Sequence, residues 1–123
     1  MTPDQRWHTP EDSSPMDPLT FDYEKLHVRV DRGVFELFQP NDLTTTLRIP
    51  LHWLGVLVHY RKPGRPGELI FGAVNDPRTA LYGTDLASFG YRSTMAVRVP
   101  SSDEPLFRAY FTEVAAHAGR PVI

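Results

Sequence analysis

The chain has 123 residues, enough for one domain that buries a hydrophobic core of its own. It contains no cysteine, which excludes disulfides, thiolate metal sites and cysteine nucleophiles. Its 13 Lys and Arg residues nearly balance 15 Asp and Glu residues, for a formal net charge of −2, whereas a dedicated nucleic-acid binder usually carries a strongly basic surface.

The sequence predicts neither export nor membrane insertion. The N-terminus lacks the basic and then apolar pattern of a secretion signal. Gly55 interrupts the central apolar run, which is far too short to span a membrane. We therefore expect a cytoplasmic protein that is not integral to a membrane and has no nucleic-acid partner.

Residues 1–22 are predicted to form a disordered or extended tail, and residues 23–123 a single domain. Prolines recur and apolar residues are sparse in the tail, so burial would not offset the entropy lost on ordering. Residues 1–18 hold one arginine against four acidic residues, a sum of −3. Trp7 is either an unpacked residue or an anchor for a groove of this or another chain.

Alternation of apolar and polar residues predicts about seven short strands. The first two strands form a hairpin, because Asp31-Arg32-Gly33 is a turn sequence. The segment from Ser88 to Tyr91 stays ambiguous. The predicted strands are Leu26–Asp31, Val34–Phe38, Thr44–Leu51, Leu54–Lys62, Glu68–Val74, a weaker Thr79–Leu86, and Ser93–Val99.

A corner is predicted between Pro50 and Gly55. The apolar positions are odd-numbered up to Leu51 and even-numbered from Val56 onward. A strand with a period of two cannot change faces without an inserted residue or a bend. We expect Gly55 to supply the freedom to bend, and Lys62–Gly67 to form the next loop.

One amphipathic helix is predicted from Glu104 to His117. Ser101, Ser102 or Asp103 can cap its start, and Gly119 can end it. Burial of the four large residues in its apolar stripe would contribute roughly 6–12 kcal/mol, an upper estimate. The helix is therefore expected to cover the sheet. The stripe consists of Phe107, Tyr110, Phe111, Val114 and Ala118.

This pattern resembles the pleckstrin-homology-like (PH-like) superfold, including its small bacterial members, over about residues 24–118. The resemblance rests on the strand spacing, on the run Leu47–Leu51 that turns into Val56–Val58, and on the helix Glu104–His117. It implies a strongly bent antiparallel sheet or partly open barrel, capped by the C-terminal helix. Phosphoinositide-binding members carry a basic loop between their first two strands, whereas the turn here is short and half acidic. The helix also lacks the tryptophan of many members.

No catalytic residue, metal site or cofactor is predicted. The sequence contains no HExxH, GxSxG, P-loop or GxGxxG motif. His52 and His59 flank the predicted corner and could approach each other, but a metal site needs three or four convergent ligands. We expect the five histidines to be structural or exposed. We also expect four acidic residues in turns or on exposed strand faces to be solvated: Asp31, Glu36, Asp76 and Asp85.

Two features are candidates for binding. Arg61, Lys62 and Arg65 lie on a Pro/Gly-rich loop that could meet phosphate, an anionic headgroup or an acidic peptide. At about 1 kcal/mol per cation near an anionic membrane, they give about 3 kcal/mol, less than the ~4 kcal/mol of a millimolar complex. An ordinary solvated loop is the alternative. Trp53 has apolar neighbours that favour a core position, with an exposed contact as the alternative.

These observations predict a non-enzymatic binding module for an unidentified protein partner. One alternative is a weak binder of anionic lipid or phosphate surfaces through the loop with Arg61, Lys62 and Arg65. The other is a small-ligand carrier or enzyme with a site inside the barrel, reached beside His52, Trp53 and His59.

Overall fold

The computed structural model describes residues 18–40, 45–60, 67–84 and 95–122. Within these ranges the fold is mainly β with one C-terminal helix, as predicted, and it has eight strands where about seven were expected. The elements are β1 (Leu19–Tyr23), β2 (Leu26–Asp31), β3 (Val34–Gln39), β4 (Thr45–Pro50), the 3-10 helix η2 (Leu51–Trp53), β5 (Leu54–His59), β6 (Gly67–Ala73), β7 (Tyr82–Gly83), β8 (Met95–Val99) and α1 (Glu104–Ala118).

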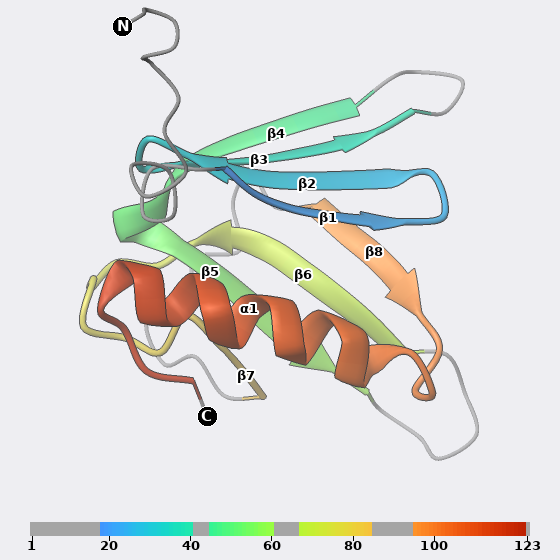
Figure 1. The fold of residues 1–123 in the computed structure, drawn as a ribbon. Helices are drawn as coiled ribbons and strands as arrows, with labels where there is room; N and C mark the ends of the chain where they lie inside the picture. The colour runs from blue at the N-terminus through green and yellow to red at the C-terminus, as the bar shows by residue number, and fades with distance from the viewer. Residues whose placement is uncertain (1–17, 41–44, 61–66, 85–94, 123) are drawn as a thin grey trace, which may run out of the picture.

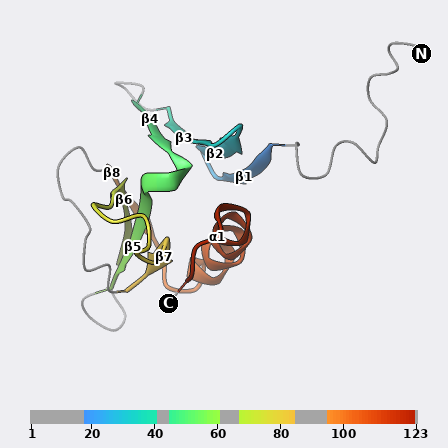
Figure 2. The same ribbon diagram turned by 90° about the vertical axis from the view of Figure 1, so that its left-hand side faces the viewer.

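The strands form two sheets that do not close into a barrel. The first sheet has the order β1-β2-β3-β4 and the second β7-β5-β6-β8. All neighbours pair antiparallel except β7, which runs parallel to β5. Helix α1 lies along the open side between the sheets (Figures 1 and 2). The predicted partly open arrangement with a helical cover is confirmed.

Strand β1 lies in a segment that the sequence assigned to the tail. Leu19, Phe21 and Tyr23 are half-buried and alternate with exposed residues. The rings of Phe21 and Tyr23 lie 5.0 and 4.9 Å from the ring of Phe107 in α1. The end of the predicted tail, from Leu19 onward, is thus an extended strand that pairs with β2, a short period-two pattern within a proline-rich context. Trp7 lies outside the described residues.

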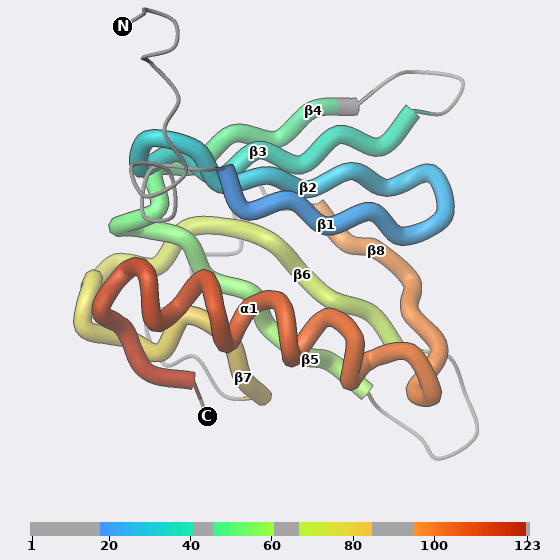
Figure 3. The backbone as a smooth tube through the Cα atoms, in the orientation of Figure 1, coloured from blue at the N-terminus to red at the C-terminus, as the bar shows by residue number. Residues whose placement is uncertain are grey.

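The predicted corner between Pro50 and Gly55 is confirmed, but a 3-10 turn makes the bend and Gly55 does not. Strand β4 ends at Pro50, one 3-10 turn follows, and β5 begins at Leu54, as the chain trace in Figure 3 shows. Gly55 stays within the regular pairing of β5, opposite Gly72 of β6. The 3-10 turn changes the direction of the chain, so the expected role of Gly55 is wrong.

Three phenylalanines join the layers at the centre of the core. Phe35 comes from the first sheet, Phe71 from the second and Phe111 from α1, and all three are fully buried. Their ring centroids lie 5.9–6.0 Å apart. The helix therefore completes one core that both sheets share, as its apolar stripe predicts.

The C-terminal segment is fastened to the corner. Gly119 ends α1 in the left-handed conformation, with φ 67°. Arg120 follows and is buried, and its guanidinium donates to the carbonyls of Leu51 (3.2 Å) and Thr79 (2.9 Å). No helix in the described part of the chain has the length and apolar character needed to cross a membrane.

Candidate binding site

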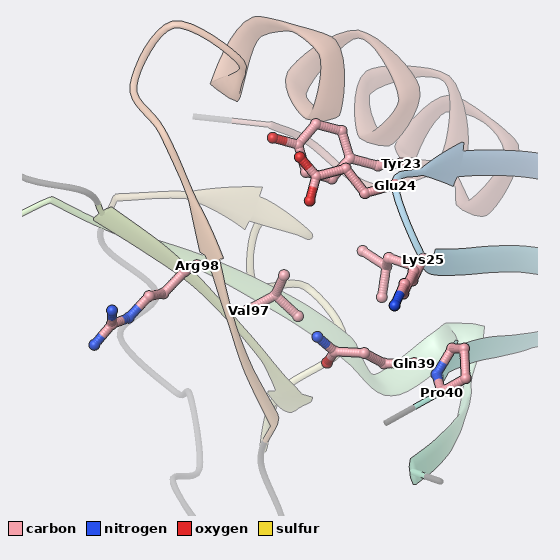
Figure 4. A pocket seen from close by; sticks show the side chains of 8 residues that line it. Tyr23, Glu24, Lys25, Gln39, Pro40, Val97 and Arg98 are labelled. Carbon is pink, nitrogen blue, oxygen red and sulfur yellow. The ribbon is translucent and has the colours of Figure 1, made fainter. Parts of the chain in front are cut away.

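A cleft of about 500 Å³ opens between the two sheets at the end opposite the corner. We call this the open-end cleft. Its residues come from the β1–β2 turn, the end of β3 and strand β8, which lie far apart in the sequence (Figure 4). They are Tyr23, Glu24, Lys25, Leu26, Gln39, Pro40, Val97 and Arg98.

The cleft follows from the way the sheets are joined. The covalent connection lies at the corner, where β4 passes through η2 into β5. Gln39 is the last residue of β3 and pairs with Thr45, and Arg98 lies one residue from the end of β8 and pairs with Glu68, so both lie far from that corner. Strand β8 pairs with β6 on one side. Val97 and Arg98 of this outermost strand of the described second sheet line the cleft.

A tight turn holds the cationic rim in place. Tyr23 pairs with Leu26 across a two-residue turn. Glu24 adopts φ 53° there, a left-handed conformation that is uncommon for a residue other than glycine. The turn carries Lys25 to the rim of the cleft.

The cleft has an apolar floor and polar edges. Leu26 and Val97 are buried, with 3% and 5% of their surfaces exposed. Figure 4 shows Val97 pointing toward Gln39 and Lys25, whereas Arg98 projects from the other side of β8. The two sides of β8 therefore offer different surfaces, one apolar and one cationic.

The cleft carries cations that are available to a ligand. Among the described residues, three exposed cations, Lys25, Arg32 and Arg98, form no ion pair and no side-chain hydrogen bond. Lys25 and Arg98 line the cleft, and Arg32 lies on the β2–β3 turn at the corner end. Glu24 is the acidic residue of the lining. The rim therefore favours an anionic partner.

Behind the cleft, tyrosine hydroxyls attach α1 to both sheets. Tyr23 of β1 donates to Oδ2 of Asp103 at 2.5 Å, and Tyr82 of β7 donates to Oε2 of Glu104 at 2.6 Å. The hydrogen bond to Asp103, with a further contribution from burial, raises the pKa of Tyr23 to about 12. Burial and then the bond to Glu104 raise the pKa of Tyr82. Both hydroxyls are protonated at neutral pH and serve as anchors.

Asp103 shows why the predicted helix cap differs. It occupies the N-cap position, as expected, but its side chain makes no capping hydrogen bond. Its carboxylate accepts a hydrogen bond from the Tyr23 hydroxyl instead. A residue type that usually caps its own helix thus bonds to a residue 80 positions away in the sequence.

Trp53 is not a core residue. It ends the 3-10 turn at the corner, with 38% of its surface exposed. Its ring meets the ring of His52 edge-on, at 5.3 Å between centroids. The core interpretation is wrong because Leu51 occupies the buried position of that turn. Trp53 lies at the corner, away from the open-end cleft.

The two histidines beside the predicted corner do not approach each other. His52 lies before the first residue of β5 and His59 is its last residue. His59 Nδ1 lies 3.6 Å from Oε1 of Glu68. In the described ranges no three His, Asp or Glu side chains are grouped closely enough to hold a metal ion.

The predicted basic loop with Arg61, Lys62 and Arg65 lies outside the described residues. The residues that flank it lie at the open end. The Tyr60 ring packs against Gly67, and its hydroxyl donates to the carbonyl of Val99 at 3.0 Å.

The acidic residues expected to be solvated pair with neighbouring arginines. Asp31 and Glu36 form ion pairs with Arg29 on the outer strand face. The Asp76 carboxylate accepts hydrogen bonds from Arg78, which lowers its pKa. Asp85 lies outside the described residues.

Sequence reasoning missed the cations that line the cleft. Lys25 and Arg98 are 73 positions apart, and neither lies in a motif. Recognition of β1 would have placed Lys25 on a hairpin turn. The position of Arg98 beside that turn depends on how the sheets are stacked.

The described residues thus form a mainly β fold of two sheets and one C-terminal helix, with a cation-rimmed cleft at the open end. No protein-family model, curated protein or solved structure matches it. Its function is therefore inferred from its own residues.

Proposed function

We propose that this protein is a non-enzymatic binding module that holds an acidic segment of a partner protein in the open-end cleft. The observation that carries the proposal is the position of Lys25 and Arg98. Both are exposed cations without a charged partner, beside an apolar floor. A cleft of about 500 Å³ is in the range of sites that accommodate small ligands or a few side chains.

The chemistry of the cleft supports binding more than catalysis. Tyr23 carries the hydroxyl of the lining, and its pKa, raised to about 12, makes it a weaker acid than an ordinary tyrosine. Its hydroxyl donates a hydrogen bond to the carboxylate of Asp103. The PH-like resemblance, supported by two sheets joined at a corner and a C-terminal helix, also fits an interaction module, although fold alone does not determine function.

The size of the expected interaction favours a transient partner. Each exposed ion pair contributes roughly 0.2–1 kcal/mol. Burial of one or two apolar side chains contributes roughly 1.5–3 kcal/mol each. Association entropy opposes these terms. The sum corresponds to weak binding, so more contacts would be needed for a permanent complex.

Selection from random peptides displayed on phage tests this function. We expect the full-length protein to enrich peptides rich in Asp and Glu. The double variant Lys25→Glu, Arg98→Glu should lose that enrichment. The variant Arg32→Glu changes charge at the corner end and should retain it. Equal enrichment by wild type and the double variant would refute the proposal.

An anionic lipid surface is a second candidate, because the loop with Arg61, Lys62 and Arg65 is flanked by residues at the open end. With Lys25, four cations would give about 4 kcal/mol near an anionic membrane, comparable with a millimolar complex. Binding to phosphatidylserine vesicles that charge reversal at the three loop positions abolishes would favour this candidate. Vesicle binding that is unchanged by the reversal would exclude it.

A further inference from the structure

We propose that the acidic segment binds as an additional β-strand on the free edge of β8, with alternate side chains facing Val97 and Arg98. This inference rests on the function proposed above and specifies the partner. The occupant is an extended segment of another protein in which apolar and acidic residues alternate.

The free edge of β8 provides the backbone groups for such a strand. β8 pairs with β6 through five residues, from Val99 opposite Gly67 to Met95 opposite Phe71. No described strand pairs with its other edge. Every second residue of an edge strand directs its N–H and C=O groups outward, and these groups can pair with an incoming strand. Two residues of this strand, Val97 and Arg98, line the open-end cleft.

The alternation of side chains along β8 favours an extended occupant over a compact one. Val97 is buried and points into the cleft, whereas Arg98 is exposed on the other side of the strand (Figure 4). A compact ligand in the cleft would meet Val97 and Lys25 but not the outer face of β8. A strand along the edge presents successive side chains to both faces. One occupant can therefore use the apolar floor and Arg98 together.

The pairing register explains why an acidic residue is expected beside Arg98. Directly opposite residues on neighbouring strands lie close enough to interact, and opposite charges there are stabilising. On the β6 side, Arg98 lies opposite Glu68 but forms no ion pair with it, and Glu68 lies beside His59 instead. An additional strand would place one of its own residues on the other side of Arg98. A carboxylate at that position would pair with the guanidinium.

The β1–β2 turn limits the occupant on the opposite wall. Tyr23, Glu24 and Lys25 face β8 across the cleft. A second acidic residue at the end of the strand can reach Lys25, while Glu24 disfavours acidic residues along the whole segment. The preferred partner thus alternates apolar and acidic residues and is not a continuous acidic run.

The probe is the synthetic peptide acetyl-Val-Glu-Val-Glu-Val-amide, titrated into the full-length protein. Two companion peptides test the mode of binding. In one, lysine replaces both glutamates; in the other, the glutamate backbone nitrogens are methylated, which removes the donors for strand pairing. Hydrogen exchange of the β8 amides, with and without peptide, reports directly on the edge.

We expect Arg98→Glu to weaken binding of the glutamate peptide by about threefold to tenfold and to strengthen binding of the lysine peptide. Arg32→Glu should change neither affinity. Backbone methylation should weaken binding by more than about tenfold, and the unmethylated peptide should slow exchange of the outward β8 amides. Circular dichroism confirms that each variant is folded.

The outcomes separate this inference from the proposed function. If the methylated peptide binds as well as the parent, the ligand is not a strand on β8, and the proposed function stands. If outward β8 amides are already protected without peptide and the probe does not bind, another segment or a second copy of this chain occupies the edge, which overturns the inference. If neither the probe nor any selected acidic peptide binds, both proposals fail.

Discussion

Replacement of Arg120 tests how the fold is held together. The burial of its charge and the hydrogen bonds of its guanidinium predict opposite changes in the free energy of unfolding. Its guanidinium is buried, with 8% of the residue exposed, and among the described residues it donates to backbone carbonyls and to no carboxylate. Burial disfavours the charged form and lowers its pKa. Replacement of buried charges by apolar groups can stabilise a protein. The variant Arg120→Met would then be neutral or stabilising.

The hydrogen bonds predict the opposite result. The guanidinium donates twice to the Thr79 carbonyl, at 2.9 and 3.2 Å, and once to the Leu51 carbonyl at 3.2 Å. Hydrogen bonds to a charged group contribute about 1.5–3 kcal/mol each, and a buried carbonyl that loses its donor adds a penalty. Relief of the buried charge offsets part of this loss. We expect Arg120→Met to lower the free energy of unfolding by roughly 2–4 kcal/mol.

Urea unfolding followed by far-ultraviolet circular dichroism measures the effect. For a domain of this size, the expected loss corresponds to a decrease in Tm of roughly 10–20 °C. The matched control is Arg78→Met, which removes an arginine whose side chain is 89% exposed and pairs with Asp76. An exposed ion pair contributes little to stability, so this variant should unfold at nearly the wild-type urea concentration. Equal losses in the two variants, or a gain in Arg120→Met, would show that these hydrogen bonds do not fasten the C-terminus.

Two further predictions concern the open end. The pKa of Tyr23 is raised above its ordinary value of 10.0 to about 12, so the contribution of its protonated hydroxyl is complete below pH 10 and disappears as pH rises through 12. Tyr23→Phe should therefore lower the free energy of unfolding by ~1 kcal/mol at neutral pH and by progressively less above pH 10, and a pH-independent difference would contradict the bond to Asp103. Gly67→Ala would place a Cβ within 2.1–2.4 Å of the Tyr60 ring. It should cost roughly 1–3 kcal/mol in urea unfolding and far less in a Tyr60→Ala background, whereas equal costs in both backgrounds would exclude this contact as the cause.

The elements that the sequence predicts well depend on local patterns. The change of phase between Leu51 and Val56 locates the corner, because a strand cannot change faces without a bend. The helix follows from its apolar stripe, its proline in the first turn and Gly119 at its end. Each of these signals can be read from one short stretch of the sequence.

The residues that the sequence mispredicts depend on contacts between elements. Trp53 has apolar neighbours, but the 3-10 turn buries Leu51 and leaves Trp53 half-exposed. Aspartate is a common N-cap residue, but the carboxylate of Asp103 accepts a hydrogen bond from the Tyr23 hydroxyl of β1. Lys25 and Arg98 line one cleft because the two sheets open at one end. Pairing patterns within a sheet can be read from alternation, but the stacking of one sheet on another cannot.

The two ends of the molecule differ in a way that suits binding at one of them. At the corner, a covalent connection, the 3-10 turn and the Arg120 hydrogen bonds all join the sheets. At the open end, the contact between sheet and helix depends on side chains, chiefly the bond from Tyr23 to Asp103 and the ring contact of Tyr23 with Phe107. Tyr23 also lines the cleft. A ligand on the edge of β8 would therefore contact the residue that anchors the start of α1, while the corner keeps the two sheets in register.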